Sequence, residues 1–220
     1  MNTLKIKVLL IVFLFTMSCS ESNTNVDETV NLPQVVIGNQ IWMKENLSVS
    51  VFRNGDPIPY ASNYEEWGES SINQKPAYCY YGDNPLNESK YGKLYNWYAV
   101  NDPRGLAPKG WHIPSDAEWT KLSDYLGGAP VAGGKMKSSY GWLSPNLGGN
   151  NLSGFNGFPG GFRDLDWIFK DSSKIGSWWT TTEAINGVTS HNRSLVYDYT
   201  VLDRFSYTQS GGLSVRCIKD

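Results

Sequence analysis

The sequence has few of the residues that most enzymes use for catalysis. Its 220 residues include three cysteines and two histidines. No G-x-S-x-G segment occurs, which excludes the usual setting of a hydrolase serine. A zinc site needs three or four clustered His, Cys or carboxylate ligands, and two widely separated histidines do not supply them. These shortages predict a protein without catalytic residues, a metal or a cofactor.

The sequence also lacks a basic run and a long apolar stretch. Its formal net charge is −2, which does not favour nucleic-acid binding. A helix that spans a bilayer needs about 20 apolar residues, and the apolar run over 8–15 is much shorter. We therefore expect neither a nucleic-acid partner nor a transmembrane segment.

The first residues have the pattern of a secretory signal. Lys5 and Lys7 precede the apolar run, and small or polar residues follow it up to Cys19. The position of Cys19 resembles a bacterial lipobox, whose cysteine is acylated after cleavage. The sequence thus predicts a signal peptide over 1–18, a polar tether over 19–33 and one domain over 34–220. The expected location is the bacterial cell envelope, anchored by lipid at the outer membrane or cell surface. An ordinary cleaved signal is the alternative.

Two cysteines remain outside the lipobox, Cys79 and Cys217. In an oxidising compartment, two cysteines without a C-x-x-C motif favour a disulfide. The bond would tie the end of the chain to an earlier strand. The alternative role, a catalytic thiol, needs a neighbouring base.

The secondary structure expected from the pattern is mixed, with short strands and two helices. Alternating apolar residues around Gly38-Asn39 predict a hairpin within 34–47. Tyr91, Leu94, Tyr95 and Tyr98 have helical spacing and predict a helix over about 91–100. Polar, irregular chain is expected over 48–75, and loop over 143–174. The remaining predicted strands cover 76–83, 176–183, 194–199, 201–208 and 212–220.

The segment "GWHIPSDAEW" raises the question whether His112 is catalytic. Ser115 and Glu118 have the S-x-x-E spacing of a capping box, in which each side chain bonds the other residue's amide. Trp119 and Leu122 follow on one face, and Gly127-Gly128 ends the helix. The nearby carboxylates thus have structural roles, and we expect His112 to be a scaffold residue.

Several stretches together resemble the Fibrobacter succinogenes major paralogous domain family, FISUMP. They include "IGNQIWMKENL", "RGLAPKGWHIPSDAEWTKLSDYLGG", "SGFNGFPGGFRD" and "GLSVRCIKD", in order over about 34–220. The resemblance implies a bacterial secreted or lipid-anchored protein with no established biochemical activity.

A more distant resemblance is to the formylglycine-generating, sulfatase-modifying proteins, through "HIPSDAEW" and "SVRCIKD". It implies an α+β, C-type-lectin-like fold: two helices on a small twisted antiparallel sheet with a long irregular loop region. Those enzymes use a pair of reactive cysteines, whereas Cys217 is the only cysteine after Cys79 here and matches a structural position. The chain is therefore expected not to be an enzyme.

A recognition surface is expected first in the irregular segment 143–174, because binding residues accumulate on loops held by a rigid scaffold. Asp164 and Asp166 suit a solvated turn or a ligand contact, and the neighbouring Trp178 and Trp179 should face opposite sides of a strand. The candidate ligand-binding residues are Asn150, Asn151, Arg163, Asp164, Asp166 and Trp167.

The sequence predicts a non-catalytic, lipid-anchored recognition module that binds a glycan or a protein. Two alternatives remain: a structural, fimbria-like envelope subunit, and a diverged enzyme of the sulfatase-modifying type.

Overall fold

A computed structural model of the chain describes residues 32–220. The predicted signal over 1–18, the acylation site Cys19 and nearly all of the tether lie outside these residues. Leu32–Asp220 forms one compact unit. It is a mixed α/β domain with small antiparallel sheets, so the expected mixture of helices and antiparallel strands is confirmed.

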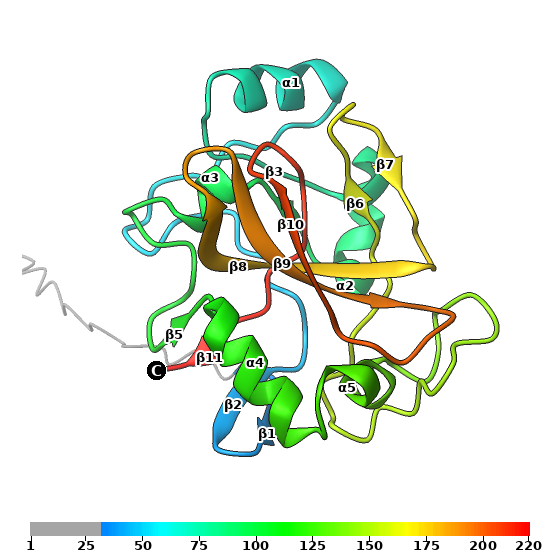
Figure 1. Ribbon diagram of the computed structural model, residues 1–220. Helices are drawn as coiled ribbons and strands as arrows, with labels where there is room; N and C mark the ends of the chain where they lie inside the picture. Colours follow the sequence, from blue (N-terminus) through cyan, green and yellow to red (C-terminus); the bar gives the residue numbers. More distant parts are fainter. Residues whose placement is uncertain (1–31) are drawn as a thin grey trace, which may run out of the picture. The chain divides into compact units, whose positions relative to one another are not determined.

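Short elements alternate along the chain (Figure 1). The helices are α1 (Tyr64–Ile72), α2 (Glu88–Tyr91), α3 (Trp97–Val100), α4 (Asp116–Tyr125) and α5 (Ala129–Met136). The strands are β1 (Gln34–Ile37), β2 (Gln40–Met43), β3 (Tyr78–Cys79), β4 (Leu94–Tyr95), β5 (Trp111–His112), β6 (Phe162–Arg163), β7 (Phe169–Lys170), β8 (Ile175–Ile185), β9 (Thr189–Val196), β10 (Asp203–Thr208) and β11 (Ile218–Lys219).

The first and last strands share one sheet, in the order β1-β2-β11-β5. Gly38, at φ 64°, lets the chain turn between β1 and β2, which confirms the predicted hairpin. Ile218 pairs with Trp42 on one side and with His112 on the other. The end of the domain therefore completes the sheet that its beginning starts.

Helix α4 begins as the sequence predicts. Ser115 Oγ accepts a hydrogen bond from the Glu118 amide at 3.3 Å, and Glu118 Oε2 accepts one from the Ser115 amide at 2.8 Å. The capping box is thus confirmed. Trp119 and Leu122 are fully buried beneath the helix.

The second sheet, in the order β10-β9-β8, divides the core. Trp178 belongs to a cluster with Trp119 and Leu195, whereas Trp179 belongs to a cluster with Tyr95 and others. The two tryptophans face opposite sides, as expected, but both are fully buried. The side expected to lie away from the core is itself core.

The predicted helix over 91–100 was wrong. Gly92, at φ 70°, ends α2, and Leu94–Tyr95 is a strand paired with β3. The Tyr95 amide donates to the Leu213 carbonyl at 2.9 Å, so a contact with the end of the chain overrides the local helical spacing. Only Trp97–Val100 returns to helix.

Two short helices were not predicted, and the first of them, α1, lies in the chain over 48–75 that was expected to be irregular. In α1, the Asn63 side chain accepts from the Glu66 amide, and Trp67 is fully buried. In α5, Gly133 and Gly134 allow the helix to pack closely against other backbone. Neither helix is long enough to show a clear apolar periodicity in the sequence.

The predicted disulfide was wrong, since Cys79 and Cys217 are both free. Cys79 lies in a cluster with Trp67 and Leu94, and Cys217 lies in another with Val215 and others. Counting cysteines cannot show that two thiols are buried in different parts of a core. Burial raises the pKa of each thiol to about 12, which keeps both protonated.

No covalent link joins these two thiols, so a reductant should leave the melting temperature of the full chain unchanged. A Cys79→Ala variant should show the same insensitivity. Calorimetry with and without a reductant provides the test. A disulfide that closes so long a loop would stabilise the fold by about 4–5 kcal/mol, so a marked fall in the melting temperature on reduction would contradict the free thiols.

Gly133 offers a second test of the packing. A Cβ at this position would lie 2.3 Å from the Val201 carbonyl oxygen. Alanine usually stabilises a helix relative to glycine by about 1 kcal/mol, but here overpacking of about 1–3 kcal/mol opposes it. We expect Gly133→Ala to lower the free energy of unfolding by up to about 2 kcal/mol. Val131→Ala, at an exposed position of the same helix, is the matched control in denaturant titrations and should change little.

Candidate functional site

The six ligand-binding residues expected from the sequence do not come together. Asn150 and Asn151 hold a turn beside α5: their side chains accept from the Leu152 and Asn156 amides at 3.1 Å and 2.8 Å. Their own amides donate to carbonyls of Gly134 and Lys137. The other four residues belong to the β6–β7 hairpin.

Arg163 is buried, with 1% of its surface exposed. Its guanidinium donates to the Trp167 carbonyl at 2.9 Å and to Asp83 Oδ1 at 3.1 Å. It also lies over the rings of Trp67 and Phe169. Arg163 therefore fixes the hairpin to the core and is not accessible to a ligand.

Asp164 and Asp166 both bond to Lys170 within the hairpin. Asp164 also accepts from the Tyr207 hydroxyl. Burial raises the pKa of Asp164, but the bonds to Lys170 and Tyr207 outweigh it, so the pKa lies below its ordinary value. Trp167 packs against Tyr64 with ring centroids 4.9 Å apart. Any ligand contact of these residues stays a prediction.

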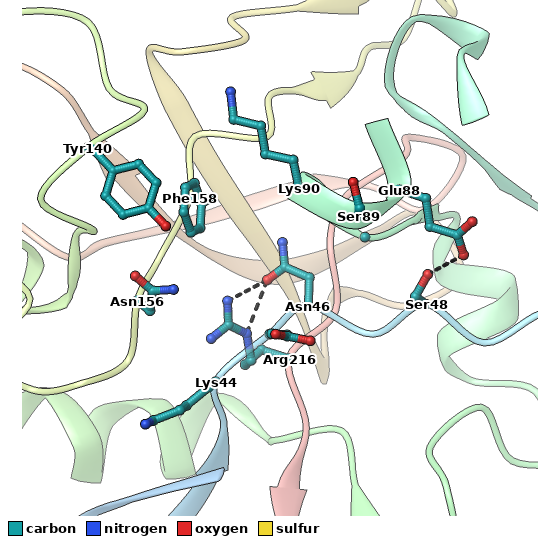
Figure 2. A pocket seen from close by; sticks show the side chains of 12 residues that line it. Lys44, Asn46, Ser48, Glu88, Ser89, Lys90, Tyr140, Asn156, Phe158 and Arg216 are labelled. Atoms are coloured by element: carbon teal, nitrogen blue, oxygen red, sulfur yellow. Dashed lines mark hydrogen bonds between the residues drawn. The ribbon is translucent and has the colours of Figure 1, made fainter. Parts of the chain in front are cut away.

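A cleft of about 500 Å³ lies elsewhere, between the segment after β2, the start of α2 and the long loop (Figure 2). Two residues of the predicted loop segment, Asn156 and Phe158, line it, but none of the six candidates does. The full lining is Lys44, Glu45, Asn46, Ser48, Glu88, Ser89, Lys90, Gly92, Tyr140, Asn156, Phe158 and Arg216.

Asn46 lies at the centre of this cleft, and both the oxygen and the nitrogen of its side-chain amide are hydrogen-bonded. Its Oδ1 accepts from Trp178 Nε1 at 2.8 Å and from Arg216 Nη2 at 2.6 Å. Its Nδ2 donates to the Tyr91 carbonyl at 2.8 Å. The side chain therefore connects β8, the chain before β11 and α2 in one network.

Arg216 provides a buried positive charge beside the cleft. It is 1% exposed, and its Nη1 donates to the Met43 and Phe155 carbonyls at 3.1 Å and 2.6 Å. Burial lowers its pKa to about 9, although the charge of Glu45 offsets part of that effect. The guanidinium thus stays protonated at neutral pH, held mainly by uncharged oxygens.

The opposite wall of the cleft is aromatic. Tyr140 is 65% exposed and meets Phe158 edge to face, with ring centroids 5.1 Å apart. Figure 2 shows this pair on one side of Asn46, Glu88 on the other, and Lys90 above Asn46. Glu88 is held by Ser48 at 2.6 Å. The cleft thus combines exposed rings with fixed polar groups.

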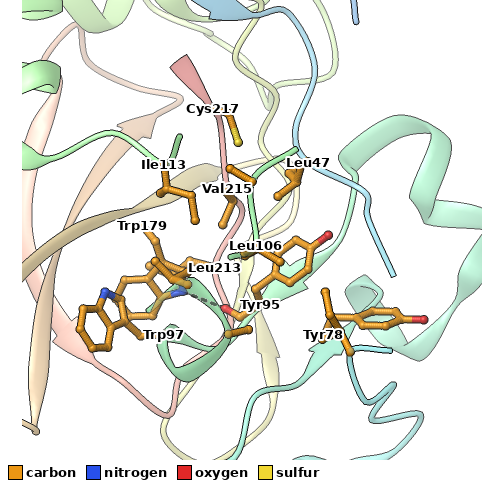
Figure 3. Close-up of a cluster of buried hydrophobic side chains, with 14 of the residues drawn as sticks. Leu47, Tyr78, Tyr95, Trp97, Leu106, Ile113, Trp179, Leu213, Val215 and Cys217 are labelled. Atoms are coloured by element: carbon orange, nitrogen blue, oxygen red, sulfur yellow. Dashed lines mark hydrogen bonds between the residues drawn. The ribbon is translucent and has the colours of Figure 1, made fainter. Parts of the chain in front are cut away.

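A second hollow, of about 440 Å³, lies on one face of the β8–β9–β10 sheet and is called the sheet-face groove below. Leu213 lies behind it, next to Trp179 in the core cluster of Figure 3. There the Trp179 indole donates to the Tyr95 carbonyl at 2.8 Å. The groove is lined by Phe162, Ile175, Ser177, Asn192, Ser194, Val196, Tyr199, Phe205, Ser206, Tyr207 and Leu213.

His112 connects two carboxylates at a partly exposed position outside both hollows. Its Nε2 lies 2.9 Å from Glu118 Oε1, and its Nδ1 lies 2.7 Å from Asp220 Oδ1. The neighbouring Ser115 hydroxyl bonds to Glu118 and not to the histidine. This geometry joins the cap of α4 to the end of the chain, as a scaffold histidine would.

Within residues 32–220, no group of three or more His, Cys, Asp or Glu side chains is arranged to hold a metal ion. In the same part of the chain, no helix has the length and apolar content to cross a membrane.

The profile of the Fibrobacter succinogenes major domain matches residues 35–219, which is nearly the whole of the described domain. The chain belongs to this family. The family assignment carries no known catalytic or binding activity. Neither the curated proteins nor the solved structures contain a significant match to the chain.

Sequence reasoning missed the residues that shape the cleft. Alternation along the predicted strand over 212–220 would place Arg216 on the face opposite Val215 and Cys217, yet all three side chains are buried. Alternation is uninformative when both faces of a strand are covered. The one available signal was the arginine itself, since a buried arginine must find several acceptors.

The contacts of His112 predict a pH dependence of stability. Partial burial lowers the pKa of His112, but the bonds to Glu118 and Asp220 raise it by more, so the net pKa is above its ordinary value. The bonds of protonated His112 to Glu118 and Asp220 therefore stabilise the folded state. This stabilisation is complete below about pH 6.5 and is lost as the pH rises through the pKa that His112 has in the folded state.

Because His112 and its two carboxylate partners are partly exposed, we expect a small fall in melting temperature, about 1–2 °C, between about pH 6 and pH 8. His112→Gln should flatten this part of the profile. His191→Gln is the matched control, because the ring of His191 bonds to the Phe205 carbonyl and to Arg204 rather than to a carboxylate. Equal profiles for the wild type and His112→Gln would contradict the prediction.

Proposed function

We propose that the domain is a non-catalytic recognition module of the bacterial cell envelope that binds a saccharide in the cleft around Asn46. The observation that carries this proposal is the exposed ring of Tyr140 facing fixed polar groups. Aromatic side chains can pack against the apolar face of a sugar, while amides and charged groups bond its hydroxyls.

The charges of the cleft favour an acidic saccharide. Its lining contains Lys44, Lys90 and Arg216 against Glu45 and Glu88. No carboxylate among residues 32–220 forms an ion pair with Arg216, and Glu88 already pairs with Lys93 at 3.1 Å. A saccharide carboxylate would therefore meet an excess of positive charge.

The proposal that the domain is not an enzyme is supported by the state of its thiols. Cys217, the cysteine nearest to the chain end, is fully buried with its pKa raised to about 12. A nucleophilic cysteine needs access and a lowered pKa. This argues against the alternative of diverged sulfatase-modifying chemistry.

We extend the proposal to the fold and the anchor. A C-type-lectin-like arrangement is supported by α4 and α5 on one face of an antiparallel sheet and by the pairing of β11 with β2. Acylation at Cys19 would attach the domain to an envelope membrane through the polar segment 19–33. Mass spectrometry of the mature N-terminus tests that step.

A glycan array probed with the full chain tests the saccharide site. We expect binding to saccharides that contain a uronic acid, and Tyr140→Ala should weaken it about tenfold through loss of the ring contact. Phe205→Ala removes a similarly exposed ring from the sheet-face groove and serves as the matched control. The proposed site would be refuted if no saccharide on the array bound, or if Tyr140→Ala and Phe205→Ala lost the same amount of saccharide affinity.

A further inference from the structure

The sheet-face groove lies on the opposite side of the β8–β9–β10 sheet from α4. Arg193 and Leu195 of β9 face the helix side, where Arg193 bonds to Asp116 and Leu195 packs near Trp119. Side chains alternate along a strand, so Asn192, Ser194 and Val196 face the other way. The groove therefore faces away from α4, and it shares no lining residue with the Asn46 cleft.

The floor of the groove is polar although almost no water reaches it. Ser177, Asn192 and Ser194 are each 4% exposed. The two serine hydroxyls lie 2.8 Å apart, and Asn192 Nδ2 donates to Ser194 Oγ at 3.1 Å. The register explains the cluster, because Ser177 pairs with Ser194, and Asn192 pairs with Trp179 on the adjacent strand.

One polar atom of this floor has no partner. Asn192 Oδ1 is buried and accepts no hydrogen bond from any residue of the described domain. Rotating the amide by half a turn would pair the oxygen with Ser194 but leave the nitrogen without an acceptor. In both orientations a buried amide group is unsatisfied, and such groups are rare in folded proteins.

A ligand hydroxyl fits this floor in both orientations of the amide. It can donate to Asn192 Oδ1, or it can accept from Asn192 Nδ2. A purely apolar ligand would leave the amide unsatisfied. A charged group would have to be stripped of water, with no opposite charge on the floor to compensate.

The walls of the groove are aromatic and aliphatic. Phe162 and Tyr207 meet edge to face at 5.7 Å, and Phe205 stands at the rim with 53% of its surface exposed. Val196 and Leu213 add apolar surface to the lining. Rings favour edge-to-face or offset contacts with another ring, so the walls suit a flat aromatic body.

We propose that the sheet-face groove binds a phenolic ring, with its hydroxyl on Asn192 and its ring between Phe205 and Tyr207. The site requires no metal, and it does not depend on saccharide binding in the Asn46 cleft. The same chemistry could belong to a free phenol or to a tyrosine side chain of a bound peptide.

Calorimetric titration of the full chain with 4-methylphenol and with toluene tests the role of the hydroxyl. The two probes share the same ring and methyl group. We expect 4-methylphenol to bind about tenfold more tightly, because only its hydroxyl satisfies the buried amide. Equal affinities, or no binding of 4-methylphenol, would overturn the proposal.

Variants locate the site. Asn192→Leu keeps the side-chain size but removes both polar atoms, so it should abolish the preference for 4-methylphenol over toluene. Phe205→Ala, at the exposed rim, should weaken both probes and keep the preference, and it remains informative if Asn192→Leu does not fold. Tyr140→Ala in the Asn46 cleft is the control and should leave both affinities unchanged. A preference that survives in Asn192→Leu, or that disappears in Tyr140→Ala, would refute the assignment.

The two sources are separated by a third probe, N-acetyl-tyrosinamide. If it binds as tightly as 4-methylphenol, with the same dependence on Asn192, the groove accepts a tyrosine that is part of a peptide. If only 4-methylphenol binds, the groove accepts a free small phenol. Each result supports the phenolic site and identifies its class of ligand.

Discussion

The fold depends on buried cationic side chains that hydrogen-bond loop carbonyls. Most of the chain between the short elements is irregular, and a buried carbonyl without a donor is costly. Lys137, fully buried, donates to the Val196 and Tyr199 carbonyls, each at 2.8 Å. Burial lowers its pKa to about 8, which still leaves it mostly charged at neutral pH. Arg163 and Arg216 likewise donate to carbonyls of two other loops, those of Trp167 and Phe155.

One of these cations, Arg216, also positions a hollow of the domain. Arg216 holds Asn46 beneath the cleft, and Asn46 in turn holds the Trp178 indole. On the opposite face of the same strand, Trp179 bonds to the Tyr95 carbonyl near the back of the sheet-face groove. The strand β8 therefore contributes to both hollows: Ser177 lies in the floor of the sheet-face groove, and Trp178 bonds to Asn46 in the cleft.

The sequence predicted the features that depend on neighbouring residues. The hairpin at Gly38 and the capping box of Ser115 and Glu118 are local, and both are present. The family was also evident from its motifs. The helix over 91–100 and the disulfide failed because long-range contacts decided them: Leu213 pairs with Tyr95, and the two thiols enter different clusters.

The candidate site was harder to predict for the same reason. The expected residues of 143–174 were chosen for their polar and aromatic character, but Arg163 and Asp164 use that chemistry within the domain. The cleft combines Asn46, Tyr140 and Arg216, which come from three distant segments. The unsatisfied amide of Asn192 is a property of the packed sheet, and no pattern of neighbouring residues indicates it.

The central place of β11 has a consequence for how the chain matures. Asn46 and Arg216 bond across 170 residues, and Ile218 pairs with both Trp42 and His112. A nascent chain lacks these partners until Arg216 and Ile218 have left the ribosome. Contacts so distant in sequence form slowly, so the domain cannot fold stably before β11 has been synthesised, and until then the chain stays open to chaperones or to transport in an extended state.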